Sequence, residues 1–65
     1  MEYNYPKCII RLRAKLNLTQ EAFAKLLNVS LSTVNRWEKG HFKPTCLIKV
    51  KLEDLFVENG INDVE

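Results

Sequence analysis

The chain has 65 residues, enough for one small domain, and its 46% apolar content suits a folded core rather than a disordered chain. The formal net charge is only +2, but residues 1–51 contain all ten Lys and Arg and three acids, whereas residues 52–65 contain five acids and no base. The basic body suits a polyanionic partner, and the lack of a long apolar run or a secretory signal predicts a cytoplasmic protein without membrane contact.

The first predicted helix covers residues 6–16. Pro6 suits the first helical position, where no backbone donor is needed, and Asn4 or Tyr5 is the expected cap. Asn17 is expected to end the helix. The apolar stripe of this helix is Ile9, Leu12 and Leu16.

Two more helices are predicted in close succession, over residues 20–27 and 31–39. Thr19 and Ser30 precede them, and both residue types cap helix N-termini by accepting hydrogen bonds from backbone N–H groups. Asn28 tolerates the left-handed backbone conformation that ends a helix and turns the chain. Two short helices joined this tightly form a helix-turn-helix.

The two faces of this unit differ in chemistry. Ala24 is small enough to let the second helix of the pair cross closely, and Val34 and Trp37 face inward on that second helix. We therefore expect Trp37 to be a core residue rather than a platform for stacked bases. Arg and Asn on the outer stripe suit base edges, since Arg pairs with guanine and Asn with adenine. The outer stripe comprises Leu31, Ser32, Asn35, Arg36 and Lys39.

The last predicted helix covers residues 46–58 and follows a short loop. Gly40 allows the positive backbone angle that ends the preceding helix, and Thr45 is the expected cap of the new one. Residues 61–65 are too few and too acidic to form a stable helix, so we expect a frayed acidic tail after a domain of residues 1–60.

The apolar residues of the last helix exceed what one helical stripe can bury. We therefore expect some of them to form a patch that pairs with the same patch of a second copy. The protein is expected to be a monomer or weak homodimer in solution, and to pair on a palindromic site with half-sites about 34 Å apart. The candidate residues are Leu47, Val50, Phe56 and Val57.

Taken together, residues spread along the chain resemble one family. They are Leu12, Arg13, Leu18, Thr19, Gln20, Phe23, Ala24, Leu27, Val29, Ser30, Val34, Arg36, Trp37, Glu38, Gly40 and Pro44. The pattern resembles the lambda-repressor-like (Cro-like, XRE) helix-turn-helix proteins from about Ile9 to Leu55. This resemblance implies an all-α, compact four-helix domain in which the family's fifth helix is absent or rudimentary. Asn28 stands where the family usually has Gly.

The resemblance also implies a function and a set of site residues. It implies sequence-specific binding of double-stranded DNA through the third helix in the major groove, in a transcriptional regulator of repressor type. Arg13 and Glu38 are implied to form a partly buried ion pair, although two unrelated surface charges are the alternative. From the outer stripe of the third helix we expect base contacts by Leu31, Ser32, Asn35 and Arg36. For Gln20 the resemblance implies a phosphate contact, with simple solvation of the helix end as the alternative. We expect further phosphate contacts from Thr19, Thr33, Lys39 and Lys43.

Other functions have less support in the sequence. No nucleophile–base pair or glycine-rich phosphate loop is visible, so we expect no enzyme, no cofactor and no small-molecule ligand. Cys8 and Cys46 are not spaced like a zinc pair and His41 is the single histidine, so we expect no metal and two buried or half-buried free thiols. The alternatives are a DNA-targeting module of a larger protein, such as a restriction–modification enzyme, and a protein-interaction module that has lost DNA binding.

Overall fold

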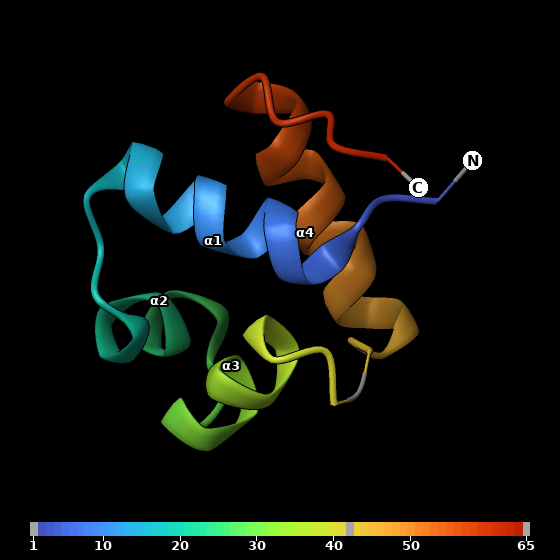
Figure 1. Cartoon of the computed structure of the whole chain (residues 1–65). Helices are drawn as coiled ribbons and strands as arrows, with labels where there is room; N and C mark the ends of the chain where they lie inside the picture. Colours follow the sequence, from blue (N-terminus) through green and yellow to red (C-terminus); the bar gives the residue numbers. More distant parts are fainter. Residues whose placement is uncertain (1, 42, 65) are drawn as a thin grey trace.

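The computed structural model describes residues 2–41 and 43–64. Within them the chain forms four helices and no strand, apart from an isolated antiparallel bridge between Tyr3 and Val64. The predicted all-α four-helix fold is therefore confirmed, and no fifth helix follows in the described part of the chain. The helices are α1 (Tyr5–Leu16), α2 (Gln20–Leu27), α3 (Leu31–Glu38) and α4 (Cys46–Glu58), as Figure 1 shows.

Local hydrogen bonds set where the helices begin. The side chains of Asn4, Thr19 and Ser30 each accept a bond from the backbone N–H three residues later, at 3.1–3.3 Å. Because Asn4 is the cap, α1 begins one residue earlier than predicted. Thr45 holds the corresponding position before α4, with extended backbone angles, but its side chain makes no capping bond.

Left-handed residues set where the first two helices end. Asn17 (φ 57°) follows α1 and Asn28 (φ 58°) follows α2. Asn28 thus adopts the backbone conformation that glycine adopts most easily, which explains why Asn is accepted in the turn. The third helix ends at Glu38, one residue earlier than predicted, and Gly40 (φ 75°) then reverses the chain.

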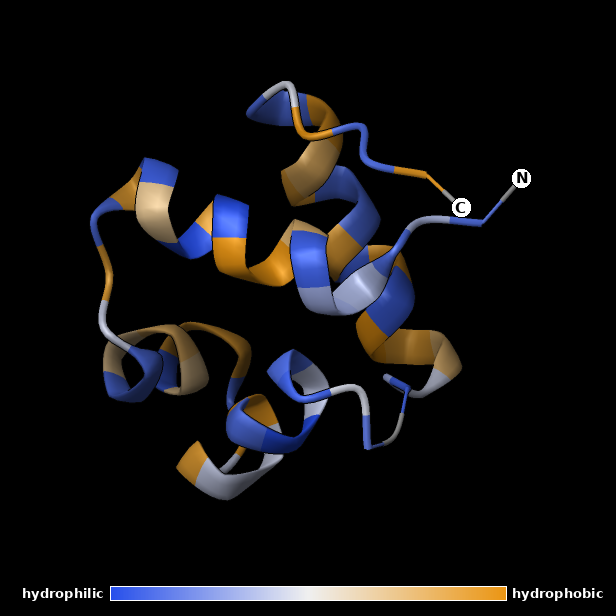
Figure 2. Cartoon of the chain, in the orientation of Figure 1, coloured by the Kyte–Doolittle hydropathy of each residue, from blue (hydrophilic) through white to orange (hydrophobic). Residues whose placement is uncertain are grey.

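All four helices contribute to one core, and hydrophobic residues occur in each of them (Figure 2). Ala24 and Trp37 are each 3% exposed, so both lie in the interior as predicted. Cys8 is buried, but Cys46 is exposed rather than half-buried, and both are free thiols. No described helix is long and apolar enough to cross a membrane. The core residues are Tyr5, Cys8, Ile9, Leu12, Phe23, Ala24, Leu27, Val34, Trp37, Leu52, Phe56 and Ile61.

The C-terminal residues 61–64 differ from the frayed tail that the sequence suggested. Gly60 (φ 69°) turns the chain back after α4, and Ile61 is only 8% exposed. Burial of that one apolar side chain stabilises the turn and carries the following residues along the start of the chain. The final residue of the expected tail, Glu65, lies outside the described residues.

Polar contacts of Asp63 hold this segment against α1. The backbone carbonyl of Asp63 accepts hydrogen bonds from the Asn4 N–H at 2.9 Å and from the Cys8 thiol at 3.1 Å. The Asp63 carboxylate lies 3.1 Å from Nε of Arg11. Burial raises the pKa of the Cys8 thiol, so this group remains a neutral donor at physiological pH.

Candidate nucleic-acid interface

The third helix has one buried side and one exposed side. Val34 and Trp37 are 0% and 3% exposed and fix the helix to the core. On the other side Leu31 is 46% exposed, and the helix lies at the edge of the molecule in Figure 1. The remaining outer residues are Ser32, Arg36 and Lys39, which are exposed, and Asn35, which is half-buried. The structure thus brings the candidate base-contacting residues to one solvent-facing surface.

An ion pair links the first helix to the end of the third. Nε of Arg13 lies 2.7 Å from Oε2 of Glu38, and Nη2 of Arg13 donates to Oε1 at 3.1 Å. These two parallel nitrogen–oxygen contacts make the ion pair bidentate, which strengthens it and fixes its orientation. The Arg13 side chain is only 24% exposed and the Glu38 side chain 9%. The hydrogen bond to Glu38 raises the pKa of the Arg13 guanidinium, and the Nη1 group also donates to the Leu18 carbonyl at 3.1 Å.

Gln20 joins the second helix to this ion pair. Its side-chain nitrogen Nε2 donates to Oε1 of Glu38 at 3.0 Å. The sequence indicated a phosphate contact for Gln20 and contained no sign of its hydrogen bond to Glu38. A primary amide has two N–H donors, so the bond to Glu38 leaves one donor for a phosphate at the start of α2. Glu38 therefore holds α1, α2 and α3 in one polar network.

The start of α3 carries a cluster of three hydroxyl groups. Oγ of Ser30 lies 3.2 Å from Oγ of Ser32 and 2.8 Å from Oγ1 of Thr33. Because each hydroxyl can both donate and accept, these bonds leave capacity for a further partner. Thr33 is half-buried, and Thr19 is exposed while capping α2.

The two candidate phosphate-binding lysines have different surroundings. Lys39 is exposed at the end of α3. Nζ of Lys43, in the loop before α4, lies 3.7 Å from the Glu2 carboxylate, and Nζ of Lys49 lies 3.8 Å from the same group. No local pattern in the sequence indicates this contact, since Glu2 reaches the loop only through the fold. The Lys43 and Glu2 side chains are 64% and 55% exposed, so their attraction is weak.

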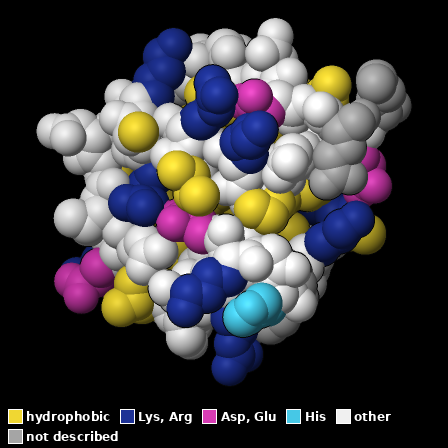
Figure 3. Space-filling view, in the orientation of Figure 1, with side chains coloured by type: hydrophobic (Ala, Val, Ile, Leu, Met, Phe, Trp, Pro, Cys, Tyr) yellow, Lys and Arg dark blue, Asp and Glu magenta, His cyan; other side chains and the backbone are white. Residues whose placement is uncertain are grey.

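One face of the molecule is mainly basic. In Figure 3 the visible face carries more basic than acidic side chains, with Lys and Arg over both α1 and α3. The segment 61–64 lies on the opposite side of Figure 1 from α3. The described residues contain no group of three or more side chains suited to a metal ion.

Comparison with known families agrees with this geometry. A family model described as helix-turn-helix matches residues 9–46, more than half of the chain. The chain belongs to the helix-turn-helix family. The matched segment contains the whole of α2 and α3, the turn between them and the Arg13–Glu38 pair. This supports the lambda-repressor-like interpretation and a DNA-binding domain. Searches of curated proteins and of solved structures found no match.

Proposed function

We propose that this helix-turn-helix domain binds double-stranded DNA sequence-specifically, with α3 in the major groove, and acts as a transcriptional regulator of repressor type. The observation that carries the proposal is the two-sided character of α3. Val34 and Trp37 bury one side, and the Glu38 network fixes the end of the helix. The opposite side contains the half-buried Asn35 and the exposed Arg36. A rigid helix with such an outer stripe suits readout of base edges.

Each outer residue has a proposed role. Arg36 reads guanine and Asn35 reads adenine, because their side chains can form two parallel hydrogen bonds to those bases. Leu31 contacts a thymine methyl group, and Ser32 bonds to a base edge. The phosphate contacts, which fix the position of the domain on the duplex without reading its sequence, fall to Thr19, Gln20, Thr33, Lys39 and Lys43.

Operator binding is proposed to involve two copies. One domain of this size spans few base pairs, so a single copy binds weakly. Two copies on a palindromic site, with α3 helices in successive turns of the major groove about 34 Å apart, bind more tightly because the second contact becomes effectively intramolecular.

The first experiment is selection of bound sequences from a random duplex pool, followed by titration of the selected and random duplexes at several salt concentrations. We expect a palindromic consensus and a strong fall in affinity with salt, because each neutralised phosphate releases counterions. Absence of salt-dependent binding to any duplex would refute the proposal and favour a protein-interaction module.

One observation favours a second setting for the same DNA-binding activity. The bridge between Tyr3 and Val64 brings the two ends of the described chain together, on the side of the molecule away from α3 (Figure 1). Fusion or insertion at these ends does not cover the outer side of α3, although Glu2 at the N-terminal end contacts Lys43 in the loop after α3. This geometry suits a DNA-targeting module of a larger protein, such as a restriction–modification enzyme, and operator selection with the isolated domain tests the DNA binding that the two settings share.

A further inference from the structure

The outer side of α4 exposes large apolar side chains. Leu47, Val50 and Val57 are 81%, 60% and 72% exposed, whereas Phe56 is fully buried. Phe56 therefore does not belong to the surface patch that the sequence suggested. The three exposed residues lie within about 100° of one another around the helix, since successive residues are 100° apart. They form an apolar ridge along α4, which Asp54 interrupts between Val50 and Val57.

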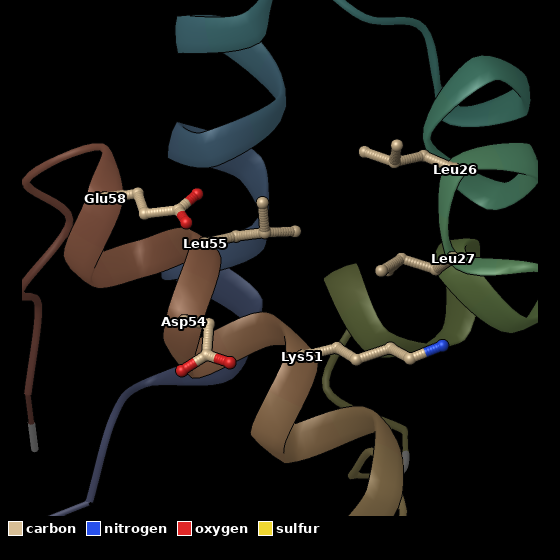
Figure 4. Close-up of a pocket in the computed structure, with 6 residues that line it drawn as sticks. All are labelled: Leu26, Leu27, Lys51, Asp54, Leu55 and Glu58. Atoms are coloured by element: carbon tan, nitrogen blue, oxygen red, sulfur yellow. The ribbon is translucent and has the colours of Figure 1, made fainter.

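An open groove of about 330 Å³ lies beside this ridge, between α2 and α4. Leu26 and Leu55 extend toward each other from the two helices in Figure 4, and Leu26 is 55% exposed. The charged residues of the lining all belong to α4, so they border the groove on one side. The groove is lined by Leu26, Leu27, Lys51, Asp54, Leu55 and Glu58.

We propose that the ridge and groove of α4 form a self-complementary surface, on which a second copy of the chain packs with its α4 antiparallel. Leu47 of each copy then enters the groove of the other. The pairing follows from positions along the helix. A two-fold axis on the outer side of α4, at the level of its buried middle residue Leu52, brings Leu47 of one copy beside Val57 of the other, because each lies five residues from that level. The same symmetry brings Lys51 within reach of Asp54 of the other copy.

The charges favour a second copy over an unrelated partner. Lys51 is the base among the groove-lining residues, and Asp54 and Glu58 are the acids. In the antiparallel arrangement Lys51 of each copy faces Asp54 of the other, so this pairing occurs twice in the isologous interface. Glu58 lies near the N-terminus of the other copy's α4, where the helix dipole favours an acid. A uniformly basic or uniformly acidic partner would leave one sign facing its like, which is unfavourable.

The size of the surface sets the strength of the pairing. The 13 residues of α4 span roughly 20 Å, at about 1.5 Å per residue. One helix pair of this length is smaller than a standard stable interface of about 1,600 Å², so the dimer is weak in solution. On palindromic DNA this contact joins the two bound copies, and that role rests on the proposed function. The formation of the dimer without DNA does not depend on the proposed function.

The first test is sedimentation equilibrium of the DNA-free chain over about 10 µM to 1 mM, a range suited to weak association. Leu47→Asp is expected to weaken self-association at least about tenfold. An acid in the first turn of α4 is compatible with the helix dipole, so the fold should persist, as circular dichroism can verify. Ile10→Asp, at a 44% exposed apolar position on α1, is the matched control and should leave association unchanged.

The second test reverses the charges across the interface. Lys51→Glu and Asp54→Lys should each weaken association, and the double variant should restore it, because the exchanged charges again face each other in the dimer. A native chain that is monomeric throughout the concentration range would overturn the inference. So would a dimer that Leu47→Asp leaves intact, or a double variant that fails to recover.

DNA binding separates this inference from the proposed function. The Leu47→Asp variant should bind a single half-site as well as the native chain does, and lose only the additional affinity for the palindrome. A native dimer that binds no DNA would refute the proposed function and leave the interface standing. Equal affinity of the variant and the native chain for the palindrome would show that the α4 contact plays no part in operator binding.

Discussion

Replacement of Glu38 by Ala is the most informative perturbation of the fold, because this carboxylate links three helices. The substitution removes the two carboxylate acceptors of Arg13 and the acceptor of Gln20, at distances of 2.7–3.1 Å. Breaking a fully buried ion pair costs about 3–5 kcal/mol. The Arg13 side chain is 24% exposed and retains its bond to the Leu18 carbonyl, so water and that carbonyl offset part of the loss. We expect a destabilisation of about 2–3 kcal/mol.

Urea denaturation at neutral pH measures this loss, and thermal unfolding provides a second readout. In a domain of this size 1 kcal/mol corresponds to about 4–8 °C in Tm, so the variant should melt roughly 10–20 °C lower. The matched control is Glu21→Ala. Glu21 lies 4.0 Å from Lys25 on the surface of α2, with side chains 70% and 80% exposed, and its loss should cost no more than about 0.5 kcal/mol.

A double-mutant cycle isolates the pairwise contribution. Arg13→Met combined with Glu38→Ala should be less destabilising than the sum of the single changes, because each single change leaves one charge without its partner and the double variant leaves none. If Glu38→Ala costs no more than the Glu21→Ala control, the network does not stabilise the fold, and the argument that it fixes α3 fails.

Three further outcomes follow from burial. Ala24→Leu should destabilise the domain by about 1–3 kcal/mol in urea denaturation, because the added methylenes force α2 and α3 apart; an unchanged midpoint would refute this packing. A thiol reagent should label Cys46 rapidly and Cys8 only on unfolding, and equal rates in the native state would contradict the burial of Cys8. Burial, and the hydrogen bond to Glu53, raise the pKa of Tyr5, so the native chain retains its proton above pH about 10, where the unfolded chain loses it. Stability should therefore fall as pH rises beyond that point, and Tyr5→Phe should reduce the fall.

Local chemistry explains why the helix-turn-helix unit was predictable. Thr19 and Ser30 accept hydrogen bonds from backbone N–H groups three residues away, and Asn28 turns the chain by adopting the left-handed backbone conformation. Such signals act over a few residues, so the sequence displays them directly. The inward phase of Val34 and Trp37 is equally local, because it depends only on the helical repeat.

Contacts between distant residues explain what the sequence did not reveal. Ile61 is a single apolar residue in an acidic segment without periodicity, and its burial depends on space that the packed helices provide. The position of Glu2 beside Lys43 depends on the path of the N-terminal segment. Phe56 and Val57 are adjacent and both apolar, yet only the relation of α4 to the core decides that one is buried and the other 72% exposed.

The proposed base reading predicts different losses for two cationic residues. Arg36 is exposed on α3, and its neighbour Trp37 fixes the backbone on which it stands. If Arg36 pairs with guanine, Arg36→Ala should cost about 1–3 kcal/mol on the selected operator and less on random duplex, where only one charge is lost. Lys43→Ala should instead weaken binding to both duplexes alike and lower the salt slope by about one unit.

The salt bridge of Lys43 provides a control for this comparison. Because Glu2 lies 3.7 Å from Nζ of Lys43, a phosphate must compete with that carboxylate for the ammonium group. Glu2→Gln should therefore raise affinity for operator and random duplex by the same factor, which identifies a sequence-independent contact. If Arg36 reads a base, Arg36→Ala must behave differently from both Lys43→Ala and Glu2→Gln. Equal losses on operator and random duplex would assign Arg36 to a phosphate and leave Asn35, Ser32 and Leu31 as the remaining candidates for sequence readout.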